Sequence, residues 1–196
     1  MKKKTTWILH PFEKIAGWPA LAWGIAGMAL STVLSVYSGY HYHGLLHFGA
    51  APNNAWWVYA AEHLTVWIIP ALLFWLGGLI LSKSAIRPVD VFGTVAFAQL
   101  PLIGMNLYAL TPPMQRIVRF NPDQSMQEIL GNQQFISDGM LSLIGIVFLV
   151  WALIWMFNAL KVSCNLKGAK LGILYAVAVI GGDVLCRIII GGLYTI

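Results

Sequence analysis

The sequence predicts an all-α fold: a polytopic transmembrane bundle of five membrane-spanning helices, with the N-terminus cytoplasmic and the C-terminus outside. Composition supports this first, because 59% of the 196 residues are hydrophobic and only 10% are charged, against about 25% charged in an average soluble protein. The mean hydropathy is +0.74. So few polar side chains cannot cover a soluble surface, which argues against a soluble enzyme, a disordered chain and a disulfide-stabilised scaffold.

Five apolar runs are long enough to cross a bilayer. A hydrocarbon core about 30 Å thick needs about 20 helical residues at about 1.5 Å each. The runs are apolar all round, whereas strands of a membrane barrel alternate between apolar and polar residues. The predicted spans are 19–39, 56–82, 90–112, 138–160 and 171–195, in a single domain covering 1–196.

The first span follows an N-terminal segment, 1–18, that mixes apolar side chains with lysines. We expect this segment to lie in the headgroup layer and the span to be an uncleaved helix. Small residues recur along the span at four-residue intervals, so they share one face and allow another helix to approach closely. That face packs either inside the monomer or against a second copy or partner. Its members are Gly27, Ser31, Ser35 and Gly39.

The second and third spans each contain a proline, Pro70 and Pro101. Proline lacks a backbone N–H and predicts a local break or kink in a membrane helix. Glu62 is the only charged residue of the second span.

The distribution of Lys and Arg predicts the orientation. Nine of the twelve basic residues fall in the N-terminal segment and in the connections 83–89 and 161–170, which lie on one side in a five-span chain. Only two fall in the connections on the other side. Basic residues accumulate on the cytoplasmic side of membrane proteins. The same clustering between apolar runs does not suggest a nucleic-acid partner.

Several ionisable residues fall inside or at the ends of spans, where an isolated charge costs several kcal/mol. Asp183 and Arg187 are four residues apart and share a helix face. We expect such residues to meet in one polar pocket in the outer half of the bundle. The pocket is either a proton, phosphate or lipid-headgroup site or a structural network that fixes helix register. The candidate members are Glu62, His63, Asp138, Asp183 and Arg187.

Three further histidines, His41, His43 and His47, lie between the first two spans. Imidazole is a common metal ligand, which makes them weak candidates for a metal site. No HExxH or CxxC pattern completes a ligand set, so we expect an interfacial or hydrogen-bonding role, with no metal and no cofactor. No catalytic motif is present either, and we do not expect an enzyme.

The string Asp90-Val-Phe-Gly93-Thr-Val-Ala-Phe-Ala-Gln-Leu-Pro101-Leu resembles the third-span signature of the Yip family, the Ypt-interacting membrane proteins. The opening His10-Pro11-Phe12-Glu13-Lys14-Ile15 followed by Gly17-Trp18 is also similar to the juxtamembrane start of bacterial members. The resemblance implies a five-span bundle in the bacterial inner (plasma) membrane. It supplies no catalytic residues, and Gly93 and Pro101 match only as structural positions.

Eukaryotic relatives bind small GTPases through a long cytoplasmic N-terminal region. Only about 18 residues precede the first span here, so we do not expect small-GTPase binding. The leading prediction is a multi-pass, non-catalytic component that organises the membrane or binds a partner. Its expected partners are the lipid bilayer and a second copy or another membrane protein. The alternatives are a small transporter or a lipid- or ion-handling protein that uses the polar pocket, and then a membrane enzyme.

Overall fold

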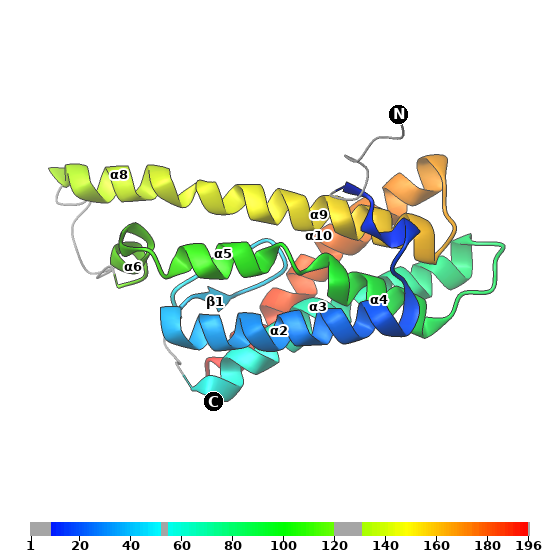
Figure 1. Ribbon diagram of the computed structural model, residues 1–196, viewed down its shortest axis with the longest axis horizontal. Helices are drawn as coiled ribbons and strands as arrows, with labels where there is room; N and C mark the ends of the chain where they lie inside the picture. The colour runs from blue at the N-terminus through cyan, green and yellow to red at the C-terminus, as the bar shows by residue number, and fades with distance from the viewer. Residues whose placement is uncertain (1–8, 52–54, 120–130, 196) are drawn as a thin grey trace.

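The computed structural model describes residues 9–51, 55–119 and 131–195, which form an elongated bundle of helices (Figure 1). Within these described residues, five helices are long and apolar enough to cross a membrane, as the sequence predicts. They are Gly17–Ser38, Trp56–Leu81, Pro88–Ala109, Gln133–Ser163 and Gly168–Leu193. Residues 1–8, which belong to the predicted interfacial segment, lie outside the described residues.

Two of these helices consist of two pieces, and short elements connect the others. The elements are, in order, η1 (Pro11–Glu13), α2 (Gly17–Ser38), β1 (His41–Tyr42), β2 (Phe48–Gly49), α3 (Trp56–Leu81), α4 (Pro88–Ala98), α5 (Leu102–Ala109), α6 (Pro112–Val118), α8 (Gln133–Ser142), α9 (Ile144–Ser163) and α10 (Gly168–Leu193). The fourth predicted span, 138–160, corresponds to α8 and α9 together, which extend it at both ends.

Only one of the two prolines singled out in the sequence interrupts its helix. α4 ends at Ala98 and α5 begins at Leu102, with Pro101 immediately before it. Proline cannot donate the backbone hydrogen bond that would continue α4. α3 runs through Pro70 without interruption, because neighbouring helices in a membrane protein can accommodate the missing bond.

Close packing of α2 against α4 fixes the centre of the bundle. A Cβ atom on Gly24 of α2 would lie 2.4 Å from the Cβ of Ala96, and one on Gly93 of α4 would lie 2.6 Å from the carbonyl oxygen of Gly17. Both distances are too short for a side chain, so glycine permits this approach. α10 packs along α3, and α9 packs on α4.

The two ends of the bundle differ (Figure 1). We call the end that holds residues 9–16, 82–87 and 164–167 the basic end, because Lys14, Lys83, Arg87 and Lys167 lie there. We call the other end, at which 39–51 and 110–119 connect the helices, the loop end.

At the basic end, the residues before α2 are attached to the helices. Phe12 is only 3% exposed and packs edge-on against Phe97 of α4 and Trp155 of α9, at ring separations of 5.8 and 6.4 Å. The side chain of Asn158 in α9 donates to the carbonyl of Leu9 at 2.8 Å. This part of the predicted interfacial segment therefore packs into the bundle as well as lying at its end.

Candidate functional site

The connection between α2 and α3, residues 39–51, folds back into the bundle as a short hairpin. β1 and β2 pair antiparallel, with His41 opposite Gly49 and Tyr42 opposite Phe48. Tyr42 and Leu45 are 1% and 2% exposed. In Figure 1 the hairpin lies among the helices rather than beyond their ends. Non-helical backbone at this depth is tolerated in a membrane only where protein buries it and satisfies its polar groups.

Glu62 of α3 supplies part of that satisfaction. Its side chain is fully buried. Nδ1 of His41 donates to Oε1 at 2.7 Å, and the backbone N–H of Tyr42 donates to Oε2 at 2.9 Å. The hydroxyl of Tyr194, just after α10, donates to Oε1 at 2.9 Å. One carboxylate thus joins the hairpin, α3 and the end of α10.

Asp183 of α10 holds the tip of the same hairpin. Its Oδ1 accepts the backbone N–H of Leu46 at 2.8 Å, and its Oδ2 lies 3.0 Å from Nδ1 of His47. A Cβ on Gly44 would lie 2.7 Å from Oδ1 of Asp183 and 2.9 Å from Cγ of Arg187. Asp183 is ten residues before Leu193, the last residue of α10, so the tip reaches about 15 Å along the helix from its end.

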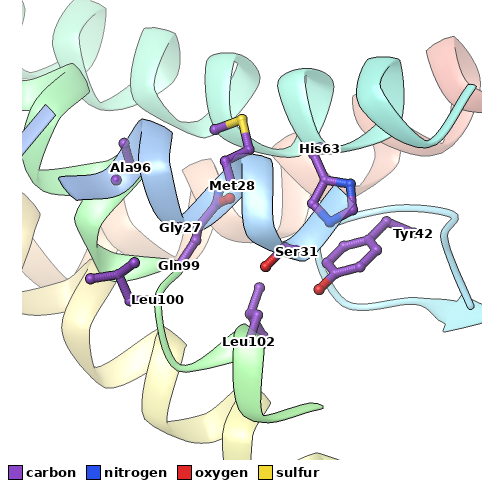
Figure 2. Close-up of a pocket in the computed structure, with 10 residues that line it drawn as sticks. Gly27, Met28, Ser31, Tyr42, His63, Ala96, Gln99, Leu100 and Leu102 are labelled. Carbon is purple, nitrogen blue, oxygen red and sulfur yellow. The ribbon is translucent and has the colours of Figure 1, made fainter. Parts of the chain in front are cut away.

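A second polar group of residues lies deeper, between α2, α3 and α4–α5. Nδ1 of His63 donates to the carbonyl of Tyr59 at 2.8 Å. Its buried Nε2 has no hydrogen-bond partner among the described residues. Figure 2 shows the His63 ring beside Tyr42 and Ser31 at a small cavity. The cavity volume of about 10 Å³ is at the lower limit for one water molecule.

Asn106 of α5 continues this group. Its Oδ1 accepts the hydroxyl of Tyr42 at 3.0 Å and that of Ser35 at 3.5 Å. Its fully buried Nδ2 has no partner among the described residues. This group of polar residues therefore extends from the hairpin to α2 and α5, and two of its N atoms have no partner among the described residues.

Asp138 lies apart from these groups. In α8 it accepts two bonds from Arg116 of α6, from Nε at 2.6 Å and from Nη2 at 2.7 Å. Gln134 donates to the same carboxylate at 3.0 Å. Such a two-point pair is geometrically specific, and it joins α6 to α8 at the loop end. The hydrogen bonds to the Asp138 carboxylate raise the pKa of the Arg116 guanidinium above its usual range, and desolvation opposes this rise.

The predicted pocket thus divides into separate places. Glu62 and His63 lie beside the hairpin, Asp183 holds its tip, and Asp138 pairs with Arg116. Arg187 makes no ion pair or hydrogen bond within the parts of the chain that the structure describes, although it is one turn from Asp183. Its side chain is exposed beside Val184 and Ile188.

The small-residue face of α2 is used within the chain. A Cβ on Gly27 would lie 2.1 Å from a methyl carbon of Leu100, and Ser31 and Ser35 are 4% and 0% exposed. Gly39 ends α2 in the left-handed conformation, at φ 69°. Gly27 and Ser35 therefore meet α5 and the residues just before it, and Gly39 lies beside Val118 of α6.

The three hairpin histidines bind different partners. His41 contacts Glu62, His43 lies 3.2 Å from the hydroxyl of Tyr194 through Nδ1, and His47 contacts Asp183. Among residues 9–51, 55–119 and 131–195 no group of three potential ligands could hold a metal ion. Burial lowers the pKa of His43 below its usual range.

Sequence reasoning missed Tyr42 and Tyr194 as partners of Glu62. The available signal was weak: a run of tyrosine and histidine, residues 40–43, between two apolar runs. Such aromatic residues are usual at a membrane interface, so the pattern does not single them out as partners of a buried carboxylate.

Comparison with known proteins agrees with this architecture. The family model of the Yip1 domain matches residues 6–186. No curated protein and no solved structure matches the chain. The match covers all five membrane-spanning helices except the last turns of α10. On this evidence, the chain belongs to the Yip1 domain family.

Proposed function

We propose that this protein is a non-catalytic scaffold of the bacterial inner (plasma) membrane, which organises the bilayer or binds a partner through the outside of its helix bundle. One observation carries the proposal. The two carboxylates placed deepest in the bundle, Glu62 and Asp183, bind backbone and side chains of the hairpin. Their chemistry is used to hold a shape, and a rigid shape is what an interaction module needs.

The orientation is part of the proposal. The positive-inside distribution supports a cytoplasmic basic end and an outward-facing loop end. Cysteines placed at Thr5 and at Thr195, in a background whose native cysteines are buried, provide the test. An impermeant thiol reagent should label only Thr195→Cys on intact cells. Labelling of both positions would contradict this orientation.

Complementation tests the scaffold role itself. In cells that lack the gene, variants such as Glu62→Gln and Asp183→Asn should restore growth or membrane phenotype in proportion to the amount of folded protein. A variant that folds to the level of the parent but has lost all activity would overturn the proposal, because a scaffold does not need the chemistry of a single buried group. Expression and detergent stability of each variant are measured in parallel.

A small proton-handling transporter is the second candidate. Nε2 of His63 lies beside a water-sized cavity and has no partner among the described residues. This favours a transporter, because imidazole can exchange protons near neutral pH. Proton flux in liposomes containing purified protein distinguishes the two. A flux that His63→Gln abolishes without loss of folding supports the transporter, and no flux above empty liposomes supports the scaffold.

A further inference from the structure

We propose that Arg187 forms a binding site for a phosphate group, supplied by a phospholipid of the leaflet at the loop end. Nothing in the scaffold role requires this site, and the tests of the two are independent. The site lies on α10, on the outside of the bundle, where Val184, Arg187 and Ile188 line an open groove of about 310 Å³.

Arg187 lies close enough to the surface of the bilayer for its side chain to reach the phosphate layer. α10 has 26 residues, which corresponds to about 39 Å of helix for a hydrocarbon core about 30 Å thick. Arg187 is six residues before Leu193, or about 9 Å from that end. In a centred helix its Cα lies about 4 to 5 Å inside the hydrocarbon boundary. A long arginine side chain can reach the phosphate layer from there, helped by local thinning of the bilayer.

The charge of Arg187 is not paired with the neighbouring carboxylate of Asp183. A charged side chain at this depth is costly unless it is paired. The nearest candidate is Asp183, one turn away, but its carboxylate binds Leu46 and His47 of the hairpin tip. No described residue pairs with Arg187. Because the described residues supply no anion to Arg187, we expect it to come from the bilayer, and phosphate is the anion that a bilayer presents at this level.

The guanidinium group of Arg187 has a geometry that suits a phosphate group. Arginine offers a planar set of N–H donors that matches two phosphate oxygens at once. The hairpin limits where this group can point, because the backbone of Gly44 packs so closely on the Arg187 stem that a Cβ there would lie 2.9 Å from Cγ. The neighbouring Val184 and Ile188, 50% and 67% exposed, provide an apolar wall for the acyl chains.

The experiment uses the full chain purified in a maltoside detergent, which contains no phosphate. Three probes are compared by their effect on the thermal unfolding midpoint and by native mass spectrometry: dioctanoyl phosphatidylglycerol, dioctanoylglycerol, and inorganic phosphate. The first two differ only in the phosphoglycerol headgroup, so the difference between them isolates the effect of that headgroup. The variants are Arg187→Met, which keeps an unbranched stem against Gly44, and Arg187→Lys, which keeps the charge. Arg119→Met removes an equal charge from another exposed position at the loop end.

Phosphatidylglycerol should bind and stabilise the parent and Arg119→Met, with the affinity reduced about tenfold or more in Arg187→Met and less in Arg187→Lys. Dioctanoylglycerol should have no such Arg187-dependent effect. Arg187-dependent stabilisation by inorganic phosphate alone would keep the phosphate site but overturn the lipid as its source. Equal binding of phosphatidylglycerol to the parent and Arg187→Met would overturn the site. If Arg187→Met does not fold, the parent protein's retention of the two lipids is compared in native mass spectrometry. Stronger retention of phosphatidylglycerol than of dioctanoylglycerol supports the site, and equal retention overturns the proposal.

Discussion

The bonds of Glu62 predict how much stability the hairpin anchor supplies. In Glu62→Gln, one of the two carboxylate oxygens becomes an NH₂ group, which cannot accept a hydrogen bond. The backbone N–H of Tyr42 can only donate, so the most favourable placement keeps the amide oxygen at Oε2. The NH₂ group then takes the place of Oε1 and donates to the hydroxyl of Tyr194 and to a neutral His41 ring that has changed its tautomer. All three bonds are kept, but none of them involves a charged oxygen any longer.

The cost follows from these three bonds. Each of the three bonds loses about 1 kcal/mol when the charged carboxylate is replaced by a neutral amide. The free energy of unfolding should therefore fall by about 3 kcal/mol. For a chain of this size, that corresponds to a lower unfolding midpoint by about 6–12 °C.

The assay is thermal unfolding in detergent, combined with hydrogen exchange of the amides in residues 39–51. Glu13→Gln is the matched control, because Glu13 is an exposed glutamate at the basic end. It should leave both measurements unchanged. A Glu62→Gln protein with the parent's midpoint and with hairpin amides that exchange as slowly as before would refute the reasoning.

Three further predictions concern other parts of the bundle. Gly24→Ala forces α2 away from α4, since its Cβ would lie 2.4 Å from Ala96, and it should lower the free energy of unfolding by about 1–3 kcal/mol. The control Gly172→Ala places its Cβ in open space and should not lower the free energy of unfolding. Equal effects of the two substitutions would contradict the packing argument. Phe12→Ala should cost about 3–5 kcal/mol in chemical denaturation, and a cost below about 1 kcal/mol would mean that Phe12 does not hold the basic end. Burial lowers the pKa of His43, so the unfolded chain binds a proton there more readily than the folded protein. The stability that neutral His43 contributes is therefore complete above about pH 6.5 and is lost as the pH falls below that value. The fall of the unfolding midpoint between pH 7.5 and 5.5 should be smaller in His43→Gln than in the parent, and an identical fall in both proteins would count against this role.

The helices could be predicted because their signal is local. A run of about 20 apolar residues identifies a span wherever its neighbours lie, and the break before Pro101 follows from the chemistry of a single residue. The path of residues 39–51 has no such signal. Glu62 is 20 residues from Tyr42, and Asp183 is 137 residues from Leu46, so their contacts depend on how the helices assemble.

The polar pocket shows how local spacing can mislead. Asp183 and Arg187 share a helix face, and that spacing favours an ion pair. The structure instead directs the carboxylate to the N–H of Leu46. An amide buried in an apolar region has no water to bind, so satisfying it is worth more than a contact with an exposed arginine. For Asp138, no local pattern favours Arg116, which is 22 residues away, over an intramembrane partner.

The anchoring of the hairpin tip on α10 has a consequence for biosynthesis. The ribosome makes the tip long before Asp183, which follows Leu46 by 137 residues. Until α10 has entered the bilayer, the N–H of Leu46 lacks this acceptor, and Glu62 of α3 holds only the first strand of the hairpin. Maturation of the newly made protein should therefore include a late step, in which the hairpin tip settles against α10 after that helix has been inserted.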